Sequence, residues 1–224
     1  MNSCNQIKKS EDKEATNTIV GISTDKAPSS NKLIANAMLD CFIFKFKTAK
    51  QQADTLVKYF GKNQLTTDEK FFCAFPESFK GMENIFGFDE NKGAAPLYYY
   101  PNVGNMIGYF ANLNSISKKI YYEKYINICV DGVWEADNIV EAFGFADRLI
   151  NDTEAACSSL SKRTDKEIKS VFHFIFDGPH PKNIQNERIY NELFPKLIKQ
   201  NEKLGKLLKD SYCKIIAEDD GHGH

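Results

Sequence analysis

The sequence predicts an all-α protein: a bundle or irregular stack of eight or nine helices behind a disordered N-terminal tether. Three observations support this class. Apolar residues recur at spacings of three and four through most of the chain from Asn31 onward. Helix start and stop signals, such as Thr164-x-x-Glu167 and Gly178, fall at the ends of these stretches. One alternating run, residues 42–47, has no partner strand, so we expect a buried helical turn there.

In the first half of the chain, five amphipathic stretches predict helices. Gly61 ends the second and Gly87 ends the fourth. Thr66-x-x-Glu69 is a capping box that opens the third, and a loop over 88–101 precedes the fifth. The residues assigned to the buried faces are Leu33, Ala37, Met38 and Cys41; Ala53, Leu56, Val57 and Phe60; Phe71, Phe72 and Phe75; Phe79, Met82 and Phe86; and Val103, Met106, Ile107 and Phe110.

The second half of the chain continues the helical pattern. The expected helices cover 116–131, 134–150, 152–160, 164–177 and, at the C-terminal end, 189–215. The helix over 116–131 is apolar on two faces, which places it near the centre of the fold. Pro195 should kink the last stretch or divide it in two. No internal repeat of about 30 to 45 residues is visible, so no named helical repeat is expected.

Three segments are expected along the chain of 224 residues, which is long enough for one well-buried domain. Residues 1–30 form a flexible polar tether, 31–217 a single helical domain, and 218–224 a disordered acidic tail with Gly and His. The tether is rich in Lys, Glu, Asp, Ser, Thr and Asn. Such a segment cannot bury enough apolar surface to offset the entropy lost on ordering.

The composition narrows the classes of partner. Lys and Arg number 29 against 30 Asp and Glu, giving a formal charge of -1. Without a basic field or a basic stripe interleaved with aromatic residues, nucleic acid is not expected as a partner. No apolar run reaches the roughly 18 residues that cross a bilayer. The 17 Phe and 10 Tyr residues indicate that large aromatic side chains fill the core.

The six cysteines show no C-x-x-C pair and no metal-ligand spacing. Five of them have apolar neighbours in helical patterns, and we expect buried free thiols that act as small hydrophobic side chains; the alternative is a disulfide framework. These five are Cys41, Cys73, Cys129, Cys157 and Cys213.

Catalytic signatures are missing from the sequence. It holds no G-x-S-x-G elbow, no H-E-x-x-H, no P-loop and no G-x-G-x-x-G. No catalytic residue, cofactor or metal is therefore expected. Asp177 and His180 lie in one compact polar loop, Asp177-Gly178-Pro179-His180-Pro181. This loop is either an acid/base pair or metal corner, or a helix stop, and the helix stop is the favoured interpretation.

Tyr98, Tyr99 and Tyr100 stand between two prolines in the loop over 88–101. Three consecutive tyrosines in a loop cannot all face one core, so at least one should be exposed. Rigid exposed aromatic side chains suit a protein contact. Alternatively, the three cover the end of the bundle and form local hydrogen bonds.

Trp134, Glu135 and Asp137 are expected at the start of a helix. Acidic side chains there interact favourably with the positive end of the helix dipole. The tryptophan either anchors a partner or is buried in the core. We take these three residues, with the three tyrosines, as candidate partner-binding residues.

Ser3-Cys4 resembles the cleavage junction of a bacterial lipoprotein, in which Cys4 is the lipid attachment site, and Ser10-Glu11-Asp12 resembles an acidic export tag. With the polar tether, the aromatic helical body and the 176–181 turn, the chain resembles small helical lipoproteins that act as toxin-immunity proteins. The resemblance implies a non-catalytic binding protein that blocks its protein partner, a toxin, by occlusion.

The same resemblance implies a place in the bacterial cell envelope, as a periplasmic or outer-membrane lipoprotein held by its lipid alone. Two alternatives stay open. One is a hydrolase that uses Glu135, Asp137 and Asp177 with His180, which requires these side chains to converge in one pocket. The other is a cytosolic helical scaffold without lipid, in which Cys4 is incidental.

Overall fold

The computed structural model describes residues 41, 44–134, 137–139 and 141–218. Several expectations from the sequence therefore lie outside the described residues. They concern the lipid attachment site Cys4, the tether over 1–30, the helix that would begin at Leu33, the candidate contact residue Glu135, and the tail from residue 219 onward.

The described residues form ten α-helices and one short antiparallel hairpin, which confirms the all-α class. The helices exceed the eight or nine expected. They are α1 (Ala49–Tyr59), α2 (Leu65–Ala74), α3 (Phe79–Phe86), α4 (Val103–Ala111), α5 (Lys118–Cys129), α6 (Phe145–Asn151), α7 (Thr153–Leu160), α8 (Asp165–Phe176), α9 (Ile184–Gln200) and α10 (Glu202–Glu218). The hairpin joins β1 (Phe88–Asp89) to β2 (Gly93–Ala94) with Phe88 opposite Ala94. None of the described helices is both long and apolar enough to cross a bilayer.

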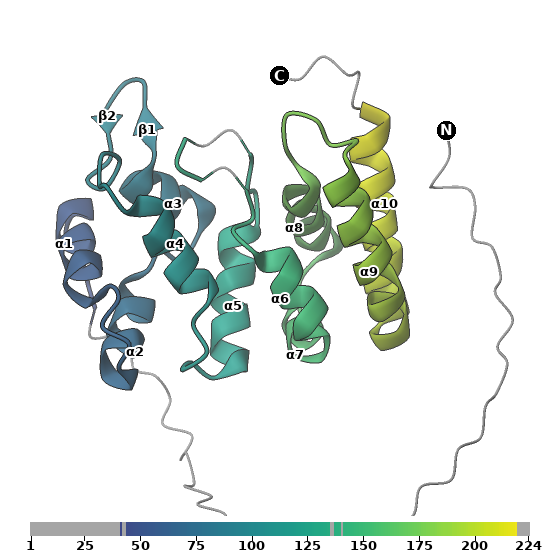
Figure 1. Ribbon diagram of the computed structural model, residues 1–224, viewed down its shortest axis with the longest axis horizontal. Coiled ribbons are helices and arrows are strands. Elements are labelled where there is room, and N and C mark those ends of the chain that lie inside the picture. Colours follow the sequence, from purple (N-terminus) through teal and green to yellow (C-terminus); the bar gives the residue numbers. More distant parts are fainter. Residues whose placement is uncertain (1–40, 42–43, 135–136, 140, 219–224) are drawn as a thin grey trace, which may run out of the picture. The chain divides into compact units, whose positions relative to one another are not determined.

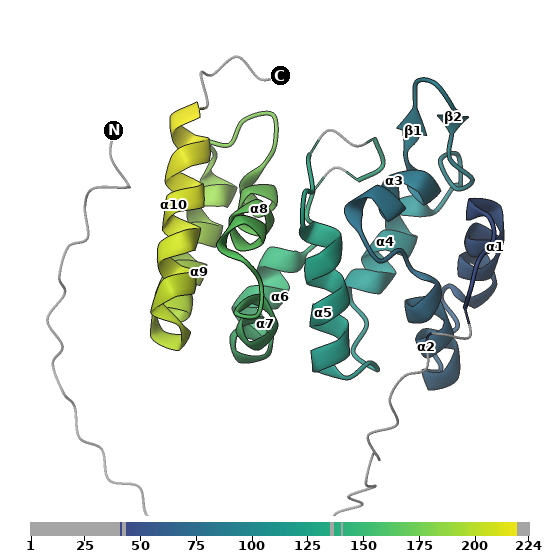
Figure 2. The ribbon, with the colours of Figure 1, turned by 180° about the vertical axis from the view of Figure 1, so that it is seen from behind.

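The helices follow one another in chain order from α1 to α10, as Figures 1 and 2 show. The main contacts join helices one to three positions apart: α1 packs on α2 and α3, α5 on α3, α7 and α8, and α9 on α6, α7 and α10. The arrangement is thus an irregular stack and not a closed bundle. In such a stack each helix depends mainly on its neighbours along the chain.

Aromatic side chains fill the centre of the stack, as the composition predicts. Phe110 of α4 is fully buried, and its ring stacks on Phe75 with 4.1 Å between centroids. Tyr125 of α5 meets Phe110 edge-on at 5.3 Å and stacks on Phe143 at 5.0 Å. Such pairs add about 0.5–1.5 kcal/mol each beyond the burial of their area. The helix over 118–129 is buried on two faces and lies centrally, as predicted.

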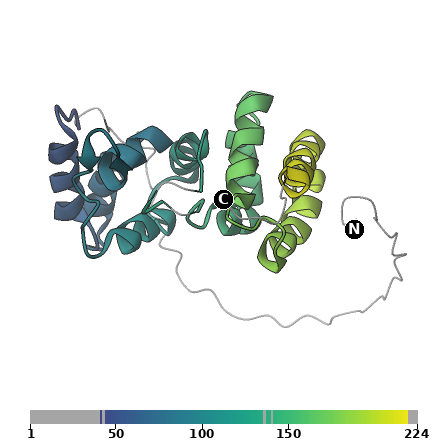
Figure 3. The same cartoon turned by 90° about the horizontal axis from the view of Figure 1, so that it is seen from above.

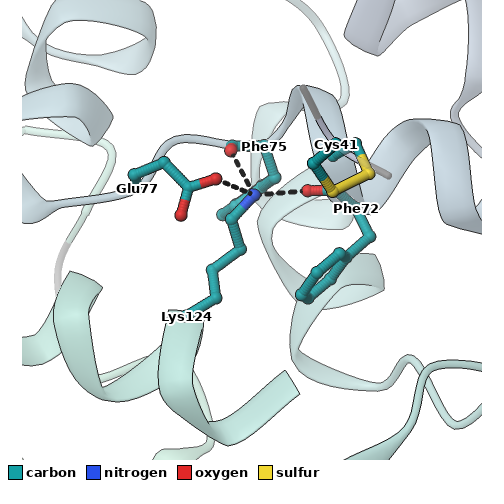
Figure 4. Close-up of a disulfide and its surroundings, with 6 residues drawn as sticks. Cys41, Phe72, Phe75, Glu77 and Lys124 are labelled. Atoms are coloured by element: carbon teal, nitrogen blue, oxygen red, sulfur yellow. Dashed lines mark hydrogen bonds and ion pairs between the residues drawn. A yellow bond between two sulfur atoms is a disulfide. The ribbon is translucent and has the colours of Figure 1, made fainter. Parts of the chain in front are cut away.

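A buried lysine from α5 donates hydrogen bonds to the carbonyl groups at the end of α2. Lys124 is only 4% exposed, and its ammonium donates to the carbonyls of Phe72 at 2.5 Å and Phe75 at 2.7 Å (Figure 4). It also pairs with Glu77 at 2.8 Å, although Glu77 itself is mostly exposed. Burial lowers the pKa of Lys124, and Glu77 opposes that shift. Because the last carbonyls of a helix have no partner within the helix, this contact ties α2 to α5.

A disulfide joins Cys41 to Cys73, with Cα atoms 5.0 Å apart (Figure 4). The expectation of free thiols at these two positions is therefore wrong. The residues are 32 apart in sequence, and only the tertiary fold brings their Cα atoms within bonding range. Cys213 is also disulfide-bonded, so the free thiol expected there is wrong as well. Cys129 and Cys157 are buried free thiols, as expected, and burial raises the pKa of Cys157 to about 11.

The start signals were predicted with mixed success. Thr164 and Glu167 form the expected capping box: the Thr164 hydroxyl accepts from the Glu167 N–H, and the Glu167 carboxylate accepts from the Thr164 N–H. The box expected at Thr66 is wrong, because α2 already begins at Leu65 and places Thr66 within its first turn. The helical turn expected over 42–47 is also wrong for its described part, since residues 44–46 are not helical.

The C-terminal stretch divides at Asn201 and not at Pro195, which lies inside α9. Asn201 adopts an extended conformation, and its side-chain oxygen accepts from the N–H groups of Lys203 and Leu204 at the start of α10. The turn is tight: a Cβ added at Gly205 would lie 2.5 Å from the Ile198 side chain. Local side-chain capping and close helix contact thus set the boundary.

A polar cluster beneath α2 joins it to α4. Asp68 is only 9% exposed and accepts hydrogen bonds from the Tyr109 hydroxyl at 2.5 Å and the Ser115 hydroxyl at 2.9 Å. The Tyr109 ring packs edge-on against Phe60 and Phe71. Burial, followed by the hydrogen bond to Asp68, raises the pKa of Tyr109 to about 12.

Replacing both Cys41 and Cys73 with serine should lower the free energy of unfolding by about 3–4 kcal/mol, because the crosslink restricts a loop of this length in the unfolded chain. Urea unfolding followed by circular dichroism measures the change. Each single replacement should cost about as much as the double one, since both break the same bond. Clearly additive losses would show that the two thiols act separately.

Replacing Tyr109 with phenylalanine should cost about 1–2 kcal/mol at neutral pH, because Asp68 loses one of its two side-chain donors. The difference from wild type should shrink as the pH rises from 10 to about 12. In that window the unfolded tyrosine loses its proton while the folded one keeps it, so its contribution to stability is lost. Urea titrations across this range test the prediction. Tyr59→Phe serves as the control, because no hydrogen bond of the Tyr59 hydroxyl occurs in the described part of the chain; an equal pH response in both variants would contradict it.

Candidate protein-binding edge

Three loops lie at the same end of the stack: residues 87–102 between α3 and α4, the described part of 130–144 (130–134, 137–139 and 141–144) between α5 and α6, and 177–183 between α8 and α9. Figures 1 and 2 show them at one end, and Figure 3 views the stack from that side. We call this surface the loop edge. Loops gathered at one end of a helical stack often form its binding face.

The first loop is a hairpin followed by the three tyrosines. The Asp89 carboxylate accepts from the N–H groups of Asn91 and Lys92, which closes the turn, and these hydrogen bonds lower the pKa of Asp89. Gly93 adopts a positive φ of 81°, a conformation that glycine tolerates without strain. The sequence predicted a loop here but not the two short strands within it.

Phe88, Tyr98 and Tyr99 form an exposed aromatic cluster on this loop. The Phe88 and Tyr98 rings lie 5.6 Å apart and those of Tyr98 and Tyr99 4.8 Å apart. Tyr99 is 80% exposed and Phe88 48% exposed. The expectation that at least one of the three tyrosines is exposed is thus met by Tyr99, while Tyr98 and Tyr100 are half-buried.

The second loop overturns the helix expected over 134–150, since helix α6 begins only at Phe145. Asp137, Phe143 and Gly144 all adopt positive φ, which a right-handed helix excludes. Asn138 donates to the carbonyls of Phe86 and Tyr98 instead of joining a helix. Side-chain hydrogen bonds to backbone compete with helix formation in this way. Trp134 therefore does not stand at a helix start.

Two polar side chains of the second loop hold the first loop in place. The Asn138 amide donates to the carbonyl of Phe86 at 2.7 Å and to that of Tyr98 at 3.0 Å. The Asp137 carboxylate accepts from the Phe88 N–H at 2.8 Å. The aromatic cluster is therefore anchored from both sides. Asp137, a candidate contact residue, uses one carboxylate oxygen for this support.

The third loop meets the second through Trp134. The Asp177 carboxylate accepts from the Trp134 N–H at 2.8 Å and from the Gly178 N–H at 3.0 Å. A Cβ added at Gly178 would lie 3.8 Å from the Trp134 ring, so the half-buried indole rests on this glycine. Asp177 and Trp134, which sequence reasoning placed in separate candidate sites, belong to one contact.

The 177–183 loop also has the features of a helix stop followed by a helix start. Asn183 caps α9 by accepting from the Asn186 N–H, and its amide donates to the His180 carbonyl. Asn186 in turn donates to the carbonyl of Phe176 at the end of α8. The His180 side chain is exposed. These contacts support the structural interpretation of this loop that the sequence favoured.

Within the described residues, Asp137 and Asp177 each support a different loop, and neither makes an ion pair with His180. No group of three or more His, Cys, Asp or Glu side chains there is placed to hold a metal ion. The three loops are instead fixed to one another by hydrogen bonds, and they leave side chains exposed at this end of the stack.

Exposed apolar side chains gather at this end. Phe88, Tyr99 and Val133 lie in the first two loops, and Ile184 directly follows the third. Among the described residues, the other exposed large apolar side chains are Val57 in α1 and Leu65 in α2. Apolar groups exposed together mark a protein contact more often than scattered ones do.

The loop edge is also acidic. Its described residues include six acidic residues against two lysines, whereas the whole chain carries a formal charge of only -1. The acidic residues are Asp89, Glu90, Asp131, Asp137, Glu141 and Asp177, and the lysines are Lys92 and Lys182. Composition alone hides this uneven distribution, because the basic residues lie elsewhere in the stack.

Comparisons with known proteins identify no relative: no family model, no curated protein and no solved structure matches the chain.

Replacing Asn138 with alanine should lower the free energy of unfolding by about 1–3 kcal/mol, because the carbonyls of Phe86 and Tyr98 lose their donor. Amide hydrogen exchange in residues 87–100 should also become faster. The matched control is Asn84→Ala on the exposed side of α3, which should change neither quantity. Unchanged exchange in the Asn138 variant would show that the loop holds itself in place.

Proposed function

We propose that this protein is a non-catalytic binding protein of the bacterial cell envelope, anchored by a lipid on Cys4, which occludes a toxin with its loop edge. The observation that carries the proposal is the aromatic cluster of Phe88, Tyr98 and Tyr99. Phe88 and Tyr99 are exposed and Tyr98 is half-buried, although the backbone beneath them is fixed by Asp137 and Asn138. A fold gains no stability from leaving such groups in water, so a partner is the natural reason for them.

The rigidity of the edge suits a binding surface. Ordering a loop on association costs free energy, and loops that are already ordered avoid that cost. Tyr and Trp side chains supply large contact areas with few rotatable bonds. The acidic residues around the cluster would favour a partner with a basic face and would speed association with it.

The disulfide between Cys41 and Cys73 supports a location outside the cytoplasm, because disulfides persist in oxidising compartments such as the periplasm. It weighs against the cytosolic scaffold, which would sit among reduced thiols. The lipid anchor itself rests on the sequence around Cys4 and needs the Cys4 sulfur for the thioether to the lipid, so a disulfide from Cys4 to Cys213 would exclude it.

The anchor has a direct test. Mass spectrometry of the mature protein should show an acylated N-terminal Cys4, and Cys4→Ser should move the protein from the membrane fraction to the soluble fraction. An unmodified Cys4 would end the envelope part of the proposal without affecting the loop edge.

Occlusion is tested by producing the protein together with the product of the neighbouring reading frame, and by measuring cell growth and complex formation on gel filtration. Tyr99→Ala and Phe88→Ala should each weaken the complex at least about tenfold, because exposed aromatic residues at the centre of a contact supply much of its binding energy. Leu65→Ala and Val57→Ala are controls, since they remove exposed apolar groups on α2 and α1, which do not belong to the edge. Growth inhibition without relief, or equal effects of all four variants, would contradict the proposal.

A further inference from the structure

We propose that a groove beneath the loop edge, between α4 and α6, receives a basic extended segment of the protein partner. This inference rests on the proposed function and names the chemistry of the partner. The groove has a volume of about 520 Å³. Its floor is α4, and its opposite wall runs from Asn138 through the second loop into α6. It is therefore continuous with the loop edge.

Three of the five residues that line the floor of the groove have a small side chain or none. Gly104 and Gly108 lie one turn apart on α4, with Ala111 following on the same side. A Cβ added at either glycine would meet no heavy atom within 4 Å. A second polypeptide backbone can therefore approach α4 closely along this line.

These two glycines have no evident structural role. A glycine inside a helix costs about 1 kcal/mol relative to alanine. At Gly132 and Gly205 the fold requires glycine, because a Cβ would clash with Phe174 or Ile198. At Gly104 and Gly108 there is open space and an ordinary helical backbone. The free-energy cost of these two helical glycines is thus explained by a bound molecule that occupies the space beside them, and not by packing within this chain.

The groove lining carries more negative than positive charge, with Glu141, Asp147 and Asp152 against Arg148. Arg148 donates to the carbonyls of Ala111 and Leu113 and to the Asn114 side chain, so its guanidinium is engaged by the end of α4. Asp152 is engaged by Lys118 and the Tyr122 hydroxyl, and the hydrogen bond from Lys118 is the main cause of its lowered pKa.

Glu141 and Asp147 also line the groove and are exposed. Neither forms an ion pair within the described residues. The position of Asp147 in the first turn of α6 is explained by the helix dipole. That explanation does not extend to Glu141, which precedes the helix. Two unneutralised carboxylates facing one groove favour a ligand with arginine or lysine side chains.

Amide side chains provide hydrogen bonds for a backbone in the groove. The Asn112 amide donates to the Gly108 carbonyl, which leaves the Asn112 oxygen as an acceptor. Asn151 lines the same groove from the end of α6 and is exposed. An extended peptide presents N–H and C=O groups at regular intervals that such side chains can meet. The glycines of the groove floor, its carboxylates and its amide side chains together fit a basic extended segment.

The test uses a short fluorescein-labelled peptide of alternating arginine and glycine, with anisotropy measured on the full chain at low salt. Gly108→Leu fills the floor and should weaken binding at least about tenfold, while thermal unfolding shows equal or higher stability because leucine favours helix. The double variant Glu141→Gln, Asp147→Asn should weaken binding by a similar factor. Its matched control, Glu154→Gln with Asp54→Asn, removes two exposed carboxylates outside the groove and should bind as wild type does.

Several outcomes would overturn the inference. The first is equal affinity of the wild type and Gly108→Leu for the arginine–glycine peptide. The second is that a glutamate–glycine peptide binds the wild type as tightly. The third is that free arginine competes as strongly as the peptide does, which would indicate a small-molecule site. The complex with the protein partner separates the two proposals. If Tyr99→Ala disrupts that complex and Gly108→Leu does not, the loop edge stands and the groove fails. If the groove binds the peptide but no partner engages the edge, only the proposed function fails.

Discussion

The functional end of this protein depends on the side chain of Asn138. Its amide donates to the last carbonyl of α3, at Phe86, and to the carbonyl of Tyr98, so one group fixes both ends of the first loop to the second. Asp177 extends the connection by holding the Trp134 backbone against the third loop. The exposed aromatic side chains can remain exposed because these polar contacts fix their backbone.

Hydrogen bonds from a side chain to the carbonyl groups at a helix end recur throughout the stack. The last carbonyls of a helix lack partners within the helix, and here polar side chains from later helices supply the donors. Each contact satisfies a helix end and also joins two helices, which matters in a stack whose helices touch few neighbours. The contacts are Lys124 with α2, Arg148 with α4, Lys196 with α6 and Asn186 with α8.

These donors also explain how the groove acquires its charge. Arg148 lies in the groove wall, but its guanidinium is directed to the end of α4. Arg148 therefore forms no ion pair with Glu141 or Asp147, although its positive charge remains in the groove wall. The lining still carries more carboxylates than cations, which would favour a basic partner.

The sequence by itself determined the helical class, the aromatic core, the capping box at Thr164 and the exposure of one tyrosine among three. These features follow from local spacing and local side-chain chemistry, which a single chain displays directly. The helix expected over 134–150 failed, and the C-terminal stretch divides at Asn201 instead of at Pro195, because Asn138 and Asn201 bind backbone groups that the pattern of apolar residues does not reveal. Only the tertiary structure decided the pairing of Cys41 with Cys73, the burial of Lys124 and the meeting of three loops at one edge. Each of these joins residues distant in sequence, and the distance between such residues is set by packing.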